Sequence, residues 1–490
     1  MCFLPREDSE GKQIMSSEHQ NGRSHWLGAA AFQRHSQDRE KVDLVSELMT
    51  NVLNPVSVWA GTMQDPAELR IPSGRRQIVA DAIRSWGFSA HDFNQDELVY
   101  AAFLMFDHVL KIQDLEKWRL KSHDLKVFLM TTRAAYNDSV IYHNFRHAID
   151  VLQATFYFLL QIEALPPFPE TDKFSSNGGR SCYSTPLLKA ADALTLLVAA
   201  IGHDVGHPGV NNKFLIKVHS PLAQVYSNRS VLESFHSAAF SQILRLTWKS
   251  FYDDTEMLAL MTSSILATDM AVHGEYIHIL NDLQRRFTGA DLDAYDKRSI
   301  CGLLIKCADI SNVARAWNIA FQWTELLQNE FLEQGRLEEA AGIETALPGG
   351  PPNIHDERSL AKGQIFFIEM FADPLFRGVS EILPSLMECY NILDDIITIW
   401  KSKLDSGLEV PRSRNSSREG STLSNRSSYQ RLEGGKGTPK KSRSTTLLPP
   451  SPNYDGDIDK CDMMSGDQPH SKRIKKRSSR LRLPSIFKKR

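Results

Sequence analysis

An all-α fold is the class that this 490-residue sequence predicts. From about Arg76 onward one stretch of helical periodicity follows another, with little of the alternation that marks β-strands. Turn signals separate these stretches, for example at residues 94–95, 288–289 and 347–352. Because 42% of the residues are hydrophobic, the chain can bury a large core. We therefore predict one compact multi-helix domain at residues 76–405.

The residues ahead of that domain, 1–75, are predicted to form a weakly structured leader with one amphipathic helix at residues 42–53. The sequence starts without the basic and apolar regions of a secretory signal, and no apolar window approaches the roughly 20 residues of a membrane-spanning helix. The six cysteines make no Cys-x-x-Cys pair, which favours a reducing compartment and argues against a zinc ribbon or a disulfide scaffold. We expect a soluble, cytoplasmic protein.

A basic tail is predicted after the domain. Residues 407–490 contain 20 Lys and Arg against 8 Asp and Glu, a net charge of +12, so residues 1–406 carry −14 because the whole chain carries −2. The tail is rich in Ser, Gly and Pro, and its scattered apolar residues cannot offset the entropy of folding it. We predict that residues 406–490 are disordered and that the helical domain ends near Trp400 to Leu404.

A dense basic run ends the tail at residues 472–490. A solvated tail explains this run without any function. The functional alternatives are a nuclear import signal, which would add a nuclear fraction to the cytoplasmic one, or adhesion to an anionic membrane surface. Basic residues precede Ser444 and Ser479 as in sites of basophilic kinases, so a kinase acting on the tail is an expected partner.

A helix predicted at residues 187–203 delivers His203 and Asp204 at its end. Thr185 and Pro186 are favoured residues for the N-cap and the first helical position, and the run 205–209 stops the helix. An imidazole and a carboxylate side by side are costly to bury without an ion. An ordinary core helix followed by a loop accounts equally well for one isolated pair.

Two further segments favour a metal site over that alternative. His143 and His147 are four residues apart, a spacing that places both imidazoles on one face of a helix, and His207 repeats this spacing after His203. A third apolar helix ends in Asp309, a residue that is a poor choice for a buried helix end without a positive partner. The simplest common explanation is a dinuclear site whose first ion is bound by His147, His203, Asp204 and Asp309.

The donor set indicates hydrolysis rather than redox chemistry. Two histidines and two carboxylates suit zinc, and a second position, bridged by Asp204 and rich in water, suits magnesium or manganese. Two such ions can hold a bridging hydroxide and neutralise a phosphoryl group under attack, which indicates phosphate-ester hydrolysis. The leaving oxygen then needs a proton, and His143 is the candidate acid because it is the histidine left over.

These motifs resemble the signatures of the class I cyclic nucleotide phosphodiesterases. The resemblance rests on Tyr142-His143-Asn144 with His147, on residues 203–209 and on Ala308-Asp309 with Ser311-Asn312, and it extends from about residue 86 to 400. It implies an all-α, HD-type catalytic domain of about sixteen helices. It also implies that His147, His203, Asp204 and Asp309 bind metal, that His143 is the general acid, and that metal-bound waters are held by His207, Glu233 and Thr268.

The resemblance extends to recognition of the base. Gln364 matches the glutamine that binds the purine, Phe367 the aromatic residue that stacks on it, and Leu327 the opposing apolar wall. Without the resemblance, ordinary core packing would be the better explanation of Phe367. Relatives with an asparagine at the position of Asn312 usually favour adenine, so the expected reaction is hydrolysis of 3',5'-cyclic AMP to 5'-AMP, with cyclic GMP or dual specificity as the alternative.

The sequence also departs from the family pattern. Many relatives have Asp where this chain has Gly206, and residues 233–236 read Glu-Ser-Phe-His in place of the more usual Glu-Asn-His-His. The general pattern is most similar to fungal members. Two rival functions remain. Another nucleotide phosphohydrolase with the same metal core leaves Gln364 and Phe367 unexplained, and an inactive nucleotide-binding scaffold leaves the complete ligand set unexplained.

Overall fold

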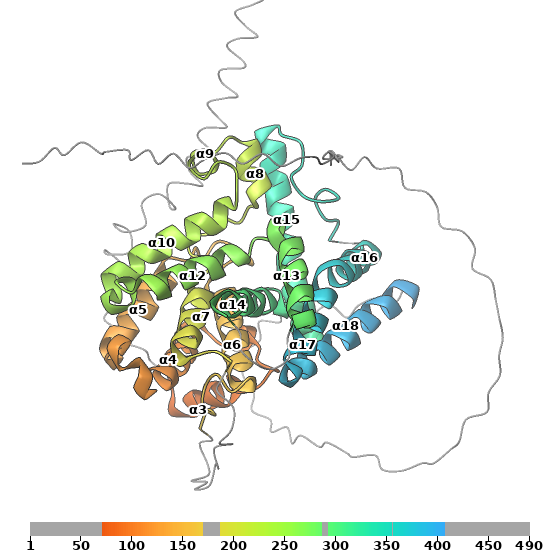
Figure 1. The fold of residues 1–490 in the computed structure, drawn as a ribbon. Helices are drawn as coiled ribbons and strands as arrows, with labels where there is room; N and C mark the ends of the chain where they lie inside the picture. The colour runs from red at the N-terminus through yellow and green to blue at the C-terminus, as the bar shows by residue number, and fades with distance from the viewer. Residues whose placement is uncertain (1–70, 170–186, 287–292, 355, 407–490) are drawn as a thin grey trace, which may run out of the picture. The chain divides into compact units, whose positions relative to one another are not determined.

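The computed structural model describes residues 71–169, 187–286, 293–354 and 356–406. Within these ranges it contains sixteen α-helices and no strand, so the predicted all-α class is confirmed (Figure 1). The helices are α3 Ser73–Ala82, α4 Gln95–Leu110, α5 Ser122–Ala134, α6 Phe145–Gln161, α7 Ala190–Gly202, α8 Asn212–Lys217, α9 Pro221–Val225, α10 Val231–Thr247, α11 Lys249–Tyr252, α12 Thr255–Ala267, α13 His273–Arg286, α14 Ala294–Asp309, α15 Trp317–Ala341, α16 Glu357–Phe367, α17 Asp373–Ile382 and α18 Met387–Ser406.

Short helical turns complete the described chain. The 3-10 turns are η2 Ala90–Asp92, η3 Gln113–Trp118, η4 Met270–Val272, η5 Ser311–Ala314 and η7 Pro384–Leu386, and a π-helical turn, η6 Ile368–Ala372, joins α16 to α17. None of the described helices combines the length and the apolar character that a membrane crossing requires. The predicted helix at residues 42–53, the turn at 288–289 and the basic tail lie outside the described residues.

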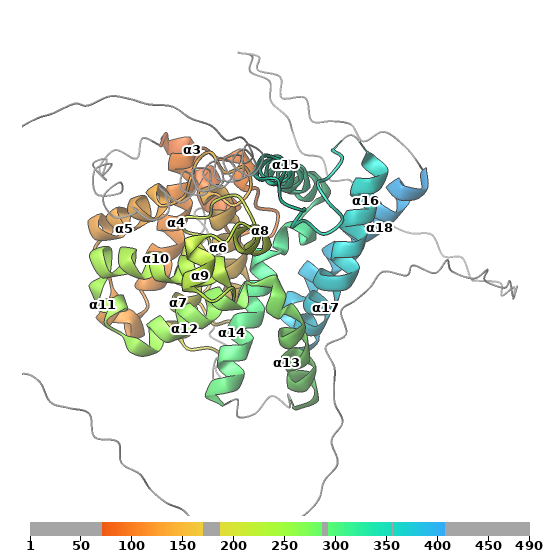
Figure 2. The same cartoon turned by 90° about the horizontal axis from the view of Figure 1, so that it is seen from above.

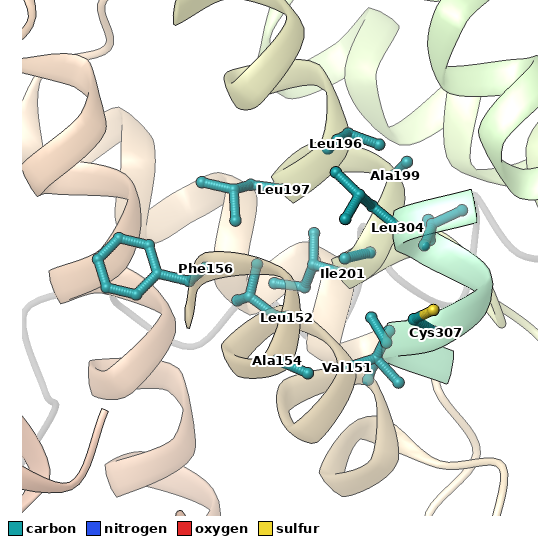
Figure 3. Close-up of a cluster of buried hydrophobic side chains, with 14 of the residues drawn as sticks. Val151, Leu152, Ala154, Phe156, Leu196, Leu197, Ala199, Ile201, Leu304 and Cys307 are labelled. Atoms are coloured by element: carbon teal, nitrogen blue, oxygen red, sulfur yellow. The ribbon is translucent and has the colours of Figure 1, made fainter. Parts of the chain in front are cut away.

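Three buried helices, α6, α7 and α14, form the centre of the fold (Figure 1). Helix α7 is buried from Ala193 to Gly202 because it is apolar on nearly all sides, whereas α6 is buried over most of its length together with polar residues such as Asp150 and Gln153. Figure 3 shows Val151 of α6, Ile201 of α7 and Leu304 of α14 among the side chains of one buried hydrophobic cluster. The ends of the same three helices carry the predicted metal ligands, so core packing fixes where those ligands lie.

Helix α6 begins later than the spacing of its histidines predicted. We expected His143 and His147 to share one face of a helix, but α6 begins at Phe145, so only His147 lies on it. Asn144 is the reason, because its side-chain oxygen accepts the N–H of Arg146 while its amide donates to the carbonyls of Val140 and Ile141. This N-cap ends a bend that contains His143.

Helix α7 also differs from its predicted bounds. It begins at Ala190 rather than 187, because the Asp192 carboxylate accepts the backbone N–H of Lys189 and so sets the first turn there. Thr185 and Pro186, the predicted start signals, lie outside the described residues. His203 is the C-cap residue, and His207 lies beyond the helix, so the His203–His207 pair is not placed by helical periodicity either.

The last helices cover one side of the central three. Helix α18 packs against both α16 and α17 (Figure 2), and it also contacts the η5 turn that follows α14. Helix α18 continues to Ser406, two residues beyond the predicted limit of Leu404. The long helix α15 connects η5 to the loop before α16, and its buried face carries polar residues that bear on the site.

Candidate metal centre

His147, His203 and Asp309 converge from three different helices. The Nε2 atoms of His147 and His203 each lie 3.2 Å from Oδ1 of Asp309. Both imidazoles are almost fully buried, and one donor atom from each of the three residues fits within 4.8 Å. The structure therefore brings together three of the four residues that were predicted to bind the first ion.

Asp204, the fourth predicted ligand, faces this group and a second one. Its Oδ2 lies 3.3 Å from Nε2 of His203 and 3.7 Å from Nε2 of His147. Its other oxygen, Oδ1, lies 3.7 Å from Nε2 of His236, and Asp204, His207 and His236 make a second group of donors within 4.8 Å. A carboxylate between two donor groups has the placement that a bridging ligand needs.

The donor atoms of this cluster fit a cation. Nδ1 of His203 and Nδ1 of His236 each lie 2.8 Å from a backbone carbonyl, which can only accept, so in the neutral form of each imidazole Nδ1 carries the proton and Nε2 presents a lone pair. Both Nε2 atoms and Oδ2 of Asp204 are buried and have no hydrogen-bond partner among the described residues. Buried lone pairs of imidazole and carboxylate, oriented by outer hydrogen bonds, are typical of a divalent metal site.

His143 lies in the bend before α6 and is held by Glu330 of α15. Nδ1 of His143 is hydrogen-bonded to one carboxylate oxygen of Glu330, and the backbone N–H groups of Tyr142 and His143 donate to the other at 2.7 and 3.1 Å. Burial alone would lower the pKa of His143, but the charge and hydrogen bond of Glu330 raise this pKa to about 9. His143 is therefore protonated near neutral pH.

Glu330 is the main site residue that the sequence analysis missed. Its own burial would raise its pKa, but the charge of His143 outweighs burial and lowers that pKa to about 2. The sequence held one signal, since Glu330, Gln334 and Glu338 recur every four residues on α15, and all three are buried. Buried polar side chains on a helix require hydrogen-bond partners, but the sequence of the helix does not identify those partners.

His207 and Glu233, which were predicted to hold metal-bound waters, lie around the same cluster. The His207 ring stacks on His143 with 4.1 Å between centroids, and burial followed by the charge of His143 holds the pKa of His207 well below its usual value. Glu233 lies in the first turn of α10, where Asn212 donates to both of its oxygens at 3.2 and 3.0 Å. Burial, and then the charge of Asp269, raise the pKa of Glu233 to about 7.

Thr268, the third predicted water-holding residue, ends α12. Its hydroxyl donates to the carbonyl of Ile265 at 2.7 Å. Lys306 of α14 fixes the backbone on both sides of Thr268, because its Nζ donates to the carbonyl of Ala267 at 2.7 Å and to that of Asp269 at 3.3 Å. The sequence analysis did not identify Lys306 or Asn212 as supports of this cluster.

The four predicted base-binding residues come from three elements. Gln364 and Phe367 lie nearly one turn apart on α16, Asn312 lies in η5 directly after α14, and Leu327 lies on α15 one turn before Glu330. The Oε1 atom of Gln364 is buried and has no hydrogen-bond partner among the described residues. The roles of these four residues stay predictions.

The fold and the cluster together define an all-helical protein whose buried His and Asp donors suit a divalent cation. Residues 142–393, slightly more than half of the chain, match the model of the 3'5'-cyclic nucleotide phosphodiesterase family. The chain belongs to this family, which confirms the family assignment that the motifs predicted. The matched segment begins at Tyr142 and contains every residue of the predicted site.

Known proteins agree with this assignment. The 3',5'-cyclic-nucleotide phosphodiesterase regA of Dictyostelium discoideum is 28% identical over 66% of this chain and 38% of that protein. The 3',5'-cyclic-nucleotide phosphodiesterase 2 of Saccharomyces cerevisiae is 31% identical over 61% of this chain and 56% of that protein. The chain thus spans about two fifths to just over half of the length of these two relatives.

Solved structures and further relatives add two facts. A crystal structure of yeast caPDE2 superposes with a TM-score of 0.59 and 32% identity, and covers 74% of this chain and 73% of that chain. The matching relatives include phosphodiesterases named for cyclic AMP and others named for cyclic GMP. A mouse 3',5'-cyclic-AMP phosphodiesterase 4C is 29% identical over 59% of this chain and 41% of that protein, and a D. discoideum cGMP-specific phosphodiesterase 3 is 28% identical over 68% and 66%.

Proposed function

We propose that the chain hydrolyses a 3',5'-cyclic nucleotide, with cyclic AMP as the substrate and 5'-AMP as the product. Family membership supports the reaction class. The observation that carries the proposal is His143, hydrogen-bonded to Glu330, beside a cluster of buried donor atoms that have no hydrogen-bond partner among the described residues. A phosphodiesterase needs this combination of a proton donor and a cation site, whereas a scaffold that only bound nucleotide would not need a positioned acid.

The donor atoms assign the residues that hold the ions. His147, His203, Asp204 and Asp309 would hold the first, proposed to be zinc because the set combines two imidazoles with two carboxylates. Asp204 would also reach the second, proposed to be magnesium or manganese. When bound, such a pair of cations supplies a water of lowered pKa and neutralises charge on the phosphate.

The proton for the leaving O3' comes from His143 in this proposal. Glu330 occupies Nδ1, so the second ring nitrogen, Nε2, is the one that can donate to substrate. About a quarter of the His143 side chain is exposed, although the residues around it are buried, which leaves the ring open to a ligand. His207 stacks on this ring and stays neutral, so it adds no charge that would expel the proton.

Recognition of the base is assigned to the residues of α16, α15 and η5. The buried Oε1 of Gln364, which no described residue engages in a hydrogen bond, can accept one from the exocyclic amine of adenine. Phe367 and Leu327 would hold the two faces of the ring, and Asn312 supports the preference for adenine. Because an amide can present its donor in place of its acceptor, cyclic GMP is the alternative substrate.

The deciding experiment measures hydrolysis of cyclic AMP, cyclic GMP and a linear phosphomonoester by the metal-loaded protein, with and without a chelator. We expect turnover of cyclic AMP that the chelator abolishes, and little action on the monoester. Inactivity on both cyclic AMP and cyclic GMP would contradict the proposal. His143→Ala should lose most of the turnover and retain the metal, whereas loss of metal would make His143 a ligand.

For residues outside the described ranges we propose a regulatory role. The basic run at 472–490 would direct the protein to the nucleus or to an anionic surface, while most of the protein stays in the cytoplasm. Phosphorylation at Ser444 or Ser479 by a basophilic kinase would cancel part of this charge. Intact-mass analysis after incubation with such a kinase tests this, and an unchanged mass contradicts it.

A further inference from the structure

Gly206 and Phe235, the sites of two departures from the family pattern, contact each other in the folded protein. A Cβ atom placed on Gly206 would lie 2.8 Å from Cε1 and 3.1 Å from Cζ of the Phe235 ring. Carbon atoms do not pack at 2.8 Å, so the ring already fills the space that any side chain at position 206 would need. The Phe235 side chain is buried.

The same contact joins the turn that carries ligands to helix α10. Gly206 lies between Asp204 and His207, and its positive φ of +77° is a conformation that favours glycine. Phe235 precedes His236, whose Nδ1 donates to the carbonyl of Val205 at 2.8 Å. The turn is thus held to α10 by one hydrogen bond and by one apolar contact on adjacent residues.

We propose that Gly206 and Phe235 form one packing unit that positions the turn at residues 203–207 against α10. Because Asp204 and His207 lie on the turn and His236 lies on α10, this unit sets the spacing between the two halves of the second donor group. A substitution at Gly206 or at Phe235 alone should then disturb the position of the turn. The proposal rests on the proposed function for its kinetic consequence, but not for its effect on folding.

A double-mutant cycle tests the unit with the residues that relatives carry. The variants are Gly206→Asp, Phe235→His and the two combined, and the readouts are the thermal midpoint, kcat and the affinity for zinc in competition with a chelator. Gly206→Asp alone should lower kcat at least tenfold and weaken zinc binding, because the new side chain must displace the ring. The combined variant should recover most of both losses, since the smaller, polar imidazole accommodates a carboxylate.

A milder pair of variants separates backbone strain from the clash. Gly206→Ala adds one methyl group against the ring, whereas Gly349→Ala adds it at an exposed glycine with φ of +80° and no atom within 4 Å of the new Cβ. Both variants place an alanine in the left-handed conformation and carry that strain. Only Gly206→Ala also meets the Phe235 ring, so it should lower the thermal midpoint more than Gly349→Ala does. In the background of Phe235→Leu that extra loss should shrink, because the six-membered ring is gone.

The outcomes are distinct. Recovery in the combined variant, together with a larger effect of Gly206→Ala than of Gly349→Ala, supports the packing unit. Additive effects of Gly206→Asp and Phe235→His, or equal effects of the two alanine variants, overturn it. If the unaltered protein hydrolyses no cyclic nucleotide, the proposed function fails, yet the thermal midpoints and the zinc affinities still decide this inference.

Discussion

Replacing Glu330 by Gln isolates the group that keeps His143 protonated. The carboxylate charge and hydrogen bond of Glu330 are what raise the pKa of His143 to about 9 against the effect of burial. Glutamine has a similar shape but no charge, so the pKa of His143 should fall to its ordinary value of about 6.5 or below. At pH 7.5 the protonated fraction of His143 then falls from nearly all to about one tenth.

The sign of the pH dependence follows from the role of a general acid. In the proposed mechanism activity requires protonated His143, so kcat is expected to fall as the pH rises through the pKa of this residue. We expect the alkaline limb of kcat to move to lower pH in Glu330→Gln by about two pH units or more. The loss of kcat at pH 7.5 should be about tenfold, and activity should partly return near pH 6. Bound cations lower the pKa of His143 in the unaltered protein and in Glu330→Gln alike. The quantity to compare is therefore the difference in pH between the alkaline limbs of the two proteins.

Glu333→Gln is the matched control for this experiment. Glu333 lies on the same helix, about half exposed, and pairs with Arg336 on the surface. The Glu333→Gln variant should leave the pH profile of kcat unchanged. The reasoning is refuted if Glu330→Gln keeps the alkaline limb of the unaltered protein, or if the control moves it as far.

Three further outcomes are expected. Gly202→Ala should lower the free energy of unfolding by about 1–3 kcal/mol, because its Cβ would lie 2.2 Å from the Phe240 ring, whereas Gly363→Ala, with no atom within 4 Å, should stabilise α16 by up to ~1 kcal/mol. Denaturant titration checks both, and equal effects would contradict the packing argument. Asp309→Asn should weaken zinc binding more than ~100-fold in competition with a chelator, and unchanged affinity would remove Asp309 from the ligand set. Gln364→Ala should raise KM for cyclic AMP about tenfold with a smaller change in kcat, and an unaltered KM would exclude a base contact.

Sequence patterns identified the metal-binding candidates well but for a partly wrong reason. His147, His203 and Asp309 do converge, as the three histidine- and aspartate-bearing segments predicted. The supposed helical face shared by His143 and His147 does not exist, because Asn144 caps α6 between them. Spacing along the chain detects that donors are present, whereas a capping hydrogen bond decides which of them lie on the helix.

Other features depend on residues far apart in the chain. Glu330 contacts His143 across 187 positions, and no local pattern specifies that pairing. The contact of Phe235 with Gly206 is equally invisible in the sequence, where each residue reads as a separate departure from the family pattern. Such pairs arise only when α15 and α10 pack against the centre of the fold.

By itself the sequence determined the all-α class, the family and the set of donors, because helical periodicity and motif spacing are local properties of the chain. The tertiary structure decided how those donors work. It buries Nε2 of His203 without a hydrogen-bond partner among the described residues, places Asp204 between two donor groups and sets the Glu330 carboxylate against His143, where it stabilises the protonated imidazole. The physical reason is that pKa and ligand geometry depend on through-space distance and burial, which only the packing of α6, α7, α14 and α15 sets.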